Sequence, residues 1–141
     1  MPAVEEMIRA HPSKPPVGGS EYAACLRACG ECARTCGACA DACLAEETIA
    51  ALRRCIRLNL DCADACDATG RMLSRQFEPN LDLLHRQLEL CRLACEACGD
   101  ECARHGDRHE HCRLAAEACR RCEEACTGLL GAMPGAARPV H

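Results

Sequence analysis

Cysteines recur along this chain at the positions where a helical bundle normally has its apolar side chains. The first six are separated by steps of four, three, four, three and four residues: Cys25, Cys29, Cys32, Cys36, Cys39 and Cys43. Alternating steps of three and four keep one residue type on one side of an α-helix. The pattern therefore predicts a helix from a cap at Ser20 to about Ala45, with a stripe of sulfur roughly 27 Å long.

A second helix is predicted over about 48–76. Its inward face alternates apolar, polar and cysteine residues, in the order Leu52, Cys55, Asn59, Cys62, Cys66, Thr69 and Leu73. The sequence Glu78-Pro79-Asn80 interrupts the chain, because the residue before a proline disfavours the helical conformation and Asn80 can cap the next helix.

The third and fourth predicted helices have opposite orders of residue type. One face of the third changes from leucine to cysteine to histidine, through Leu81, Leu84, Leu88, Cys91, Cys95, Cys98, Cys102 and His105. The fourth begins with histidine and ends with apolar residues, through His109, Cys112, Ala116, Cys119, Cys122, Cys126, Leu129 and Met133. Gly131 and Pro134 signal its end.

Four long amphipathic helices joined by three short connections predict an all-α fold, an antiparallel four-helix bundle. Antiparallel neighbours would bring His105 and His109 together at one end, near Cys43. The opposite end would gather the apolar residues Tyr22, Leu73, Phe77, the leucines of 81–88 and the segment 129–133. We therefore predict a closed apolar end, a sulfur-lined middle and a mouth with histidines.

The remaining segments are short. Residues 1–19 are predicted to be an N-terminal arm and linker, with a short helix over about 3–10 before a stretch rich in proline and glycine. We expect this arm to pack on the bundle or on a neighbouring subunit. Residues 20–133 would form the four-helix bundle, and residues 134–141 a C-terminal tail.

Composition shows that the core is unusual. The 141 residues include 17 cysteines but one tyrosine, one phenylalanine and no tryptophan. Such a cysteine density is typical of a disulfide framework or a metal protein, and the odd count excludes complete pairing within one chain. The net charge is −4. Nucleic-acid binding has no support, because no basic patch with aromatic residues is present. Membrane insertion has none either, because no apolar run is long enough to span a bilayer.

The N-terminal sequence lacks the features of an export signal. It has acidic residues at positions 5 and 6, no apolar core segment and no twin arginine. We therefore expect a cytoplasmic protein, in which thiols stay free unless they bind metal.

Seven cysteine pairs have the spacing C-x3-C, at positions 25/29, 32/36, 39/43, 62/66, 91/95, 98/102 and 122/126. At this spacing two Cβ atoms on a helix lie about 5–6 Å apart, so both thiolates can bind one soft metal ion. Soft thiolates select Cu(I), zinc or iron–sulfur clusters. A row of thiolates mid-helix suits many ions better than one compact site.

Charge favours Cu(I) among these metals. One monovalent ion per thiolate leaves a neutral core. Zinc would instead occupy about four sites of four cysteines, and each of these sites would keep two negative charges. Buried charge without a partner costs many kcal/mol, and the inward faces contain no lysine or arginine. We expect metal loading to release protons and to add stability.

Few other residues suggest chemistry. His105 and His109 are candidate ligands at the mouth, and Asn59 either assists a weakly held ion or sets the register of the helices. The other histidines lie off the inward faces and are expected to face solvent: His11, His85, His111 and His141. No Ser/His/Asp grouping, paired carboxylates or phosphate loop is present, so we predict no enzymatic activity.

Over residues 20–131 the chain resembles the bacterial copper storage proteins, in their cytosolic branch. The resemblance depends on the repeated C-x3-C pairs, the four-helix pattern and the H-x2-C sequence that starts the fourth helix. It implies a homotetramer of four-helix bundles that stores many Cu(I) ions in the cytosol. It also implies a ligand role for all 17 inward cysteines. The same role extends less directly to His105 and His109. The exported branch has a twin-arginine signal and a methionine-rich mouth, and neither is seen here.

Three other interpretations remain open from the residues alone. One is a zinc or iron–sulfur protein with a binding or redox role. Another is a helical scaffold held by disulfides, although cysteines four residues apart on one helix suit such bridges poorly. In the third, cysteine only fills the core.

Overall fold

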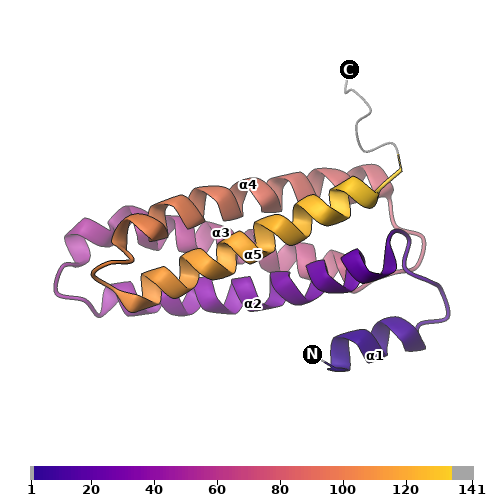
Figure 1. The fold of residues 1–141 in the computed structure, drawn as a ribbon, viewed down its shortest axis with the longest axis horizontal. Coiled ribbons are helices and arrows are strands. Elements are labelled where there is room, and N and C mark those ends of the chain that lie inside the picture. Colours follow the sequence, from indigo (N-terminus) through magenta and orange to yellow (C-terminus); the bar gives the residue numbers. More distant parts are fainter. Residues whose placement is uncertain (1, 135–141) are drawn as a thin grey trace, which may run out of the picture.

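The chain is all-helical in the computed structural model, which describes residues 2–134 (Figure 1). No strand occurs within that range. The helices, in order, are α1 (Pro2–Ala10), α2 (Gly19–Leu44), the 3-10 helix η1 (Ile49–Leu52), α3 (Arg53–Leu73), α4 (Leu81–His105) and α5 (Glu110–Ala132). The predicted helix over 48–76 is thus divided into η1 and a shorter α3.

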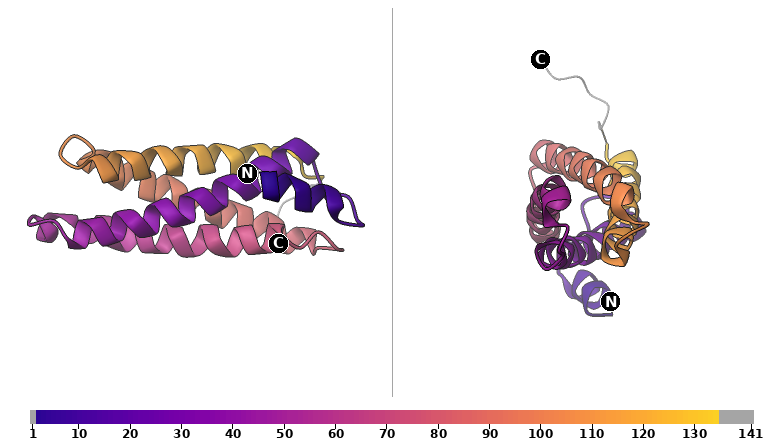
Figure 2. Two further views of the ribbon diagram at one scale, coloured as in Figure 1. Left: turned by 90° about the horizontal axis from the view of Figure 1, so that it is seen from below. Right: turned by 90° about the vertical axis from the view of Figure 1, so that its left-hand side faces the viewer.

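Four long helices surround one elongated core. Helix α2 packs against α3 and α5, and α4 packs against the same two helices. Figure 2 shows α2 to α5 around a common centre, with α1 on the outside. The α2–α3 and α4–α5 connections lie at one end of the molecule, on the left in Figure 1, and the α3–α4 connection lies at the other.

The helix starts follow local capping chemistry. Leu83 donates its backbone N–H to Asn80 Oδ1 at 3.0 Å, so the predicted cap of α4 is confirmed. The predicted cap of α2 was wrong: Gly18 caps this helix, and Ser20 lies in its first turn. The helix starts earlier because the Tyr22 N–H already bonds to the Gly18 carbonyl, at 2.7 Å.

The apolar end contains most of its predicted members. Its buried residues are Tyr22, Leu73, Leu84, Leu88, Leu129 and Met133. The Tyr22 hydroxyl donates to the Leu73 carbonyl and so joins α2 to the end of α3. Two residues were predicted wrongly: Phe77 is 67% exposed and Leu81 is 37% exposed. Phe77 lies in the connection beyond the end of α3, and Leu81 is the first residue of α4.

The N-terminal arm packs on α2 of its own chain. Glu5 and Arg27 form an ion pair, and Ile8 packs against the core. Farther along the arm, Gln76 Nε2 donates to the Ser13 carbonyl at 2.9 Å. These contacts attach α1 and the linker after it to the bundle. Of the predicted C-terminal tail, residues 135–141 lie outside the described residues, and His141 is among them.

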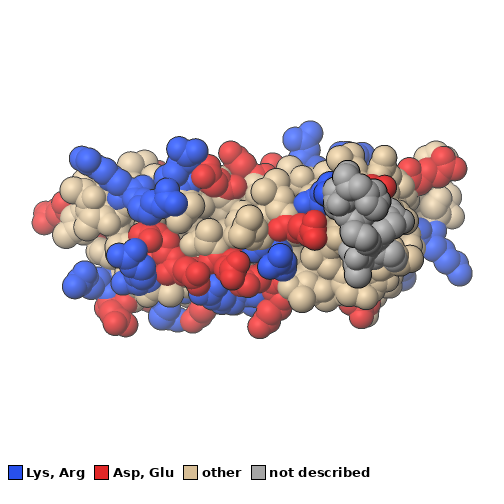
Figure 3. All heavy atoms as spheres, turned by 90° about the horizontal axis from the view of Figure 1, so that it is seen from above, with Lys and Arg blue, Asp and Glu red and all other residues tan. Residues whose placement is uncertain are grey.

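The surface carries both signs of charge. Positive and negative side chains are interspersed on the face shown in Figure 3. Among the described helices, none is both long enough and apolar enough to cross a membrane.

Candidate metal centre

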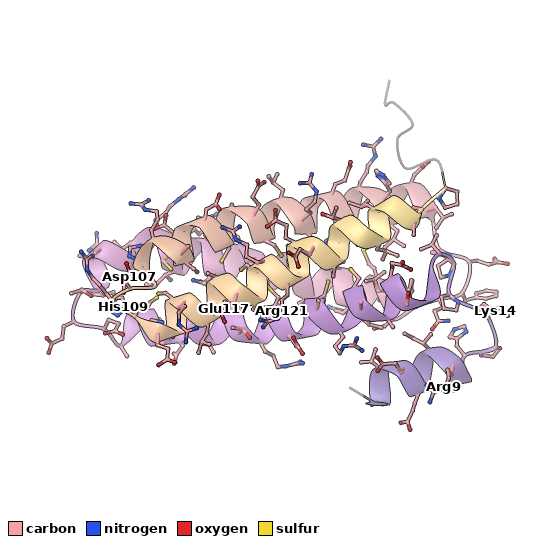
Figure 4. The ribbon with its side chains drawn as sticks, in the orientation of Figure 1. Arg9, Lys14, Asp107, His109, Glu117 and Arg121 are labelled. Carbon is pink, nitrogen blue, oxygen red and sulfur yellow. The ribbon has the colours of Figure 1, made fainter. Side chains whose placement is uncertain are left out.

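All 17 cysteines lie in the described part of the chain, and each is buried with a free thiol. None is more than 1% exposed. The helical steps of three and four therefore turn every sulfur toward the core, as the sequence pattern predicted. Figure 4 shows sulfur atoms between the long helices rather than on their outer faces.

Sulfurs from different helices lie close enough to share metal ions. Cys36 Sγ is 3.6 Å from Cys119 Sγ, and Cys66 Sγ is 3.6 Å from Cys95 Sγ. A metal ion about 2.3 Å from each of two sulfurs joins sulfurs that are up to roughly 4.6 Å apart. The thiols are therefore placed for metal binding without rearrangement of the helices.

The donors form overlapping sets. In each set the ligand atoms all lie within 4.8 Å of one another. Five such sets are Cys29/Cys91/Cys122/Cys126, Cys32/Cys66/Cys95/Cys122, Cys32/Cys36/Cys62/Cys119, Cys39/Cys55/Cys102 and Cys39/Cys43/His111/Cys112. Cys122 and Cys32 join the first three sets, and Cys39 joins the other two. Cys98 connects the two groups, because its Sγ lies 4.0 Å from Cys36 Sγ and 3.8 Å from Cys102 Sγ. The donors therefore form a continuous row rather than separate sites.

The protonated state is favoured for several of these thiols. Burial is the main cause that raises the pKa of the Cys112 thiol to about 11. A hydrogen bond with Cys122 is the main cause that raises the pKa of the Cys66 and Cys95 thiols. Before metal binds, the Cys66, Cys95 and Cys112 thiols are therefore neutral and pack as small apolar groups. For Cys25 and Cys122 the shift is opposite: a hydrogen bond with Cys126 is the main cause that lowers the pKa of both thiols. Metal binding requires thiolates, so loading releases protons.

Asn59 is fully buried inside the sulfur row. Its Nδ2 lies 3.3 Å from both Cys55 Sγ and Cys102 Sγ and donates to the Cys55 carbonyl at 2.8 Å. Its Oδ1 lies 3.4 Å from Cys98 Sγ. The amide thus satisfies its own polar groups and links α3 to α4, which supports a role in setting register.

The two predicted histidines lie at the mouth, each beside a carboxylate. His105 Nε2 is 3.0 Å from Glu101 Oε2, and His109 Nδ1 is 3.1 Å from Glu46 Oε2. Figure 4 shows His109 at the end of the molecule where α4 connects to α5.

His111 is a site residue that the sequence pattern missed. The ring was expected to face solvent, but its Nδ1 lies 3.4 Å from Cys39 Sγ and 3.7 Å from Cys112 Sγ. Its Nε2 faces Glu46 Oε2 at 2.8 Å. Steps of three and four select positions on one face of the helix, and position 111 lies off that face. His111 lies at the start of α5, where Cys39 of α2 and Glu46 just after α2 contact its ring. The one hint in the sequence was the neighbouring Cys112.

The other histidines have local roles. His85 is part-buried and lies 3.6 Å from Glu89, and His11 accepts the Ser13 N–H at 2.9 Å. Neither contacts a cysteine set.

The core thus combines many soft donors with very little charge. Among the described residues, the buried polar side chains are Asn59, Thr69, Gln76 and Glu101, and none is a lysine or arginine. A helical core with overlapping thiol sets defines a protein that binds several soft metal ions side by side. The family model described as "Csp: Copper storage protein" matches residues 19–131. The chain belongs to the copper storage protein family, and the resemblance seen in the sequence is confirmed.

Solved structures with the same fold support this assignment. The copper storage protein Ccsp from Streptomyces lividans, loaded with 10 copper equivalents, is 47% identical to this chain, and the two superpose with a TM-score of 0.89. The match covers 92% of this chain and 99% of that one. A cytosolic copper storage protein from Streptomyces lividans with five coppers is 50% identical, with a TM-score of 0.80 and coverages of 82% and 96%. The Cu(I)-bound copper storage protein BsCsp3 is 36% identical, with a TM-score of 0.69 and coverages of 77% and 97%.

Proposed function

We propose that this chain stores and buffers Cu(I) in the cytosol, holding many ions along its core without catalysing a reaction. The observation that carries the proposal is the row of 17 buried, free thiols, 15 of which belong to the five sets above. The relatives that bind copper support it, and one of them is described as cytosolic.

The ligands in this proposal are the 17 cysteines. His105 and His109 assist at the mouth, and the geometry adds His111 through its contact with Cys39. Nitrogen of imidazole is a softer donor than carboxylate oxygen, so copper can pass between the mouth and the thiols without a hard ligand.

Electrostatics favours Cu(I) over zinc for this core. Each thiolate that replaces a thiol adds one negative charge, and no buried lysine or arginine within the described residues offsets it. A monovalent ion for each thiolate leaves the core neutral, whereas a four-cysteine zinc site retains two negative charges. A core full of Cu(I) is therefore the less costly state.

We also propose an antiparallel four-helix bundle over residues 20–133, flanked by an arm over 1–19 and a tail over 134–141. Two cysteine contacts support opposite directions for α2 and α5. Cys25 Sγ lies 3.8 Å from Cys126 Sγ, and Cys39 Sγ lies 3.9 Å from Cys112 Sγ. Residue numbers thus rise along α2 as they fall along α5.

We further propose that the chain assembles as a homotetramer. The outer face of α4 supports this, because Leu83, Leu90 and Leu93 are 60%, 52% and 56% exposed. Spacings of seven and three residues place them on one side of the helix. A neighbouring copy that covers this stripe would bury apolar surface now in contact with water.

Anaerobic Cu(I) titration of the reduced protein tests the storage function. Metal content, free thiols and released protons are measured together. Storage predicts on the order of one copper per cysteine, with thiols consumed in parallel.

Other outcomes would identify the alternatives. Zinc binding that saturates near four ions and outcompetes Cu(I) would indicate a zinc protein. A coloured protein that contains iron and sulfide would indicate an iron–sulfur protein. Few free thiols before any metal is added would indicate a disulfide scaffold.

A further inference from the structure

Glu46 contacts two histidines of the mouth with one carboxylate oxygen. Its Oε2 lies 3.1 Å from His109 Nδ1 and 2.8 Å from His111 Nε2. Glu46 follows the end of α2, whereas His109 caps α5 and His111 lies in its first turn. The two rings stack, with centroids 5.5 Å apart. A single acceptor thus connects the end of one helix to two rings at the start of another.

The direction of these hydrogen bonds follows from the acceptor. Glu46 is only part-buried, and a carboxyl in contact with solvent is ionised at neutral pH. An ionised carboxylate only accepts hydrogen bonds, so the nitrogens facing it must carry the protons. His109 is then protonated at Nδ1 and His111 at Nε2. In neutral rings, the proton on one nitrogen leaves the other as a lone pair.

The lone pair of His111 then points at the sulfur row. With the proton on Nε2, the unprotonated nitrogen is Nδ1, which lies 3.4 Å from Cys39 Sγ and 3.7 Å from Cys112 Sγ. The opposite tautomer would direct an N–H at these sulfurs, and its unprotonated nitrogen, Nε2, would face Glu46 instead of the sulfurs.

Starting from the proposed function, we infer that Glu46 is a positioning residue that holds His109 and His111 in opposite tautomers. In this arrangement His111 offers Nδ1 to a Cu(I) ion bound by Cys39 and Cys112. Glu46 is not a ligand in this arrangement, because its oxygen faces Nε2 of His111, whereas Nδ1 faces the sulfurs. Carboxylate partners of metal-binding histidines typically change metal affinity by about 10- to 100-fold.

Histidine-selective ¹⁵N NMR on the reduced, metal-free protein tests the tautomers directly. At about pH 8, where free imidazole is neutral, the two ring nitrogens of each histidine give separate signals. We expect His109 to be protonated at Nδ1 and His111 at Nε2. Glu46→Ala should convert both rings to tautomer mixtures. Glu46→Gln retains an acceptor oxygen and should restore the wild-type tautomers in part.

The neighbouring glutamate supplies a matched control. Glu47 is exposed, so Glu47→Ala removes the same charge one residue away and should leave both rings unchanged. Cu(I) is diamagnetic, so the His111 Nδ1 signal can also be followed while a chelator buffers the copper. Glu46→Ala should raise the free Cu(I) needed to shift this signal by about tenfold or more.

Two results would overturn the inference. One is a wild-type His111 protonated at Nδ1, and the other is a tautomer population that Glu46→Ala does not alter. Failure here is separable from failure of copper storage, because total copper bound per chain depends on the cysteines. Glu46→Ala should bind nearly the same total as wild type, whereas a low total in the wild type would contradict storage itself.

Discussion

Cys25 Sγ and Cys126 Sγ lie 3.8 Å apart, although 101 residues separate them along the chain. The contact joins the first cysteine of α2 to the last cysteine of α5. Beyond it lie Tyr22 and Leu129, both buried. The sulfur row therefore ends against apolar side chains here, and Glu46 and Glu101 lie with their histidine partners at the other end.

A cysteine that belongs to two donor sets should contribute more to copper capacity than a cysteine that belongs to one set. Cys122 belongs to two of the five sets, whereas Cys43 belongs to one of them. Because a serine hydroxyl is a poor ligand for Cu(I), Cys122→Ser should lose about two ions per chain and Cys43→Ser about one. Copper content after anaerobic loading and gel filtration measures the difference. Equal losses in the two variants would show that the sets do not share ions.

Tyr22 should titrate unusually late. Burial, followed by the nearby Cys25, raises its pKa from 10.0 to about 12. The folded state thus favours the neutral phenol, and the stability this provides is complete below pH 10 and is lost as the pH rises through about 12. Because Tyr22 is the only tyrosine, phenolate absorbance reports it without overlap from other tyrosines. A midpoint near that of free tyrosine in the folded protein would contradict this, and Tyr22→Phe gives the baseline.

The apolar end should stabilise the metal-free protein. Leu88 is fully buried, so Leu88→Ala should lower the free energy of unfolding by about 2–5 kcal/mol through lost burial and a cavity. Leu60 lies on the outside of α3, and Leu60→Ala should change it by less than about 0.5 kcal/mol. Denaturant unfolding of the reduced protein measures both. Copper capacity should stay unchanged in Leu88→Ala, because leucine provides no ligand.

The leucine stripe on α4 should hold the subunits together. Substitution of both Leu90 and Leu93 by glutamate places two like charges on the apolar face of each copy, which should dissociate the tetramer. Sedimentation should then change from about four times the chain mass of 15.2 kDa toward that mass. Leu114→Glu alters an exposed leucine on α5 and serves as the control. A wild-type protein that sediments as a monomer would refute the proposed assembly.

Periodicity alone determined the helices and the inward direction of the cysteines. Steps of three and four occur in each long segment, and a helix places such positions on one face whatever its neighbours are. Composition then determined the chemistry of the core, because 17 cysteines replace the usual large apolar residues. The sequence also predicted where α4 begins, as the cap at Asn80 shows.

The tertiary structure decided which donors meet. The set Cys32, Cys66, Cys95 and Cys122 takes one residue from each long helix, and its membership depends on the rotation and axial offset of four helices. No local pattern specifies those quantities, because they result from packing of the whole core. The contacts of His111 with Cys39 and Glu46 arise in the first turn of α5, and the exposed Phe77 lies beyond the end of α3. There the path of the connections, rather than helical period, sets where a side chain points.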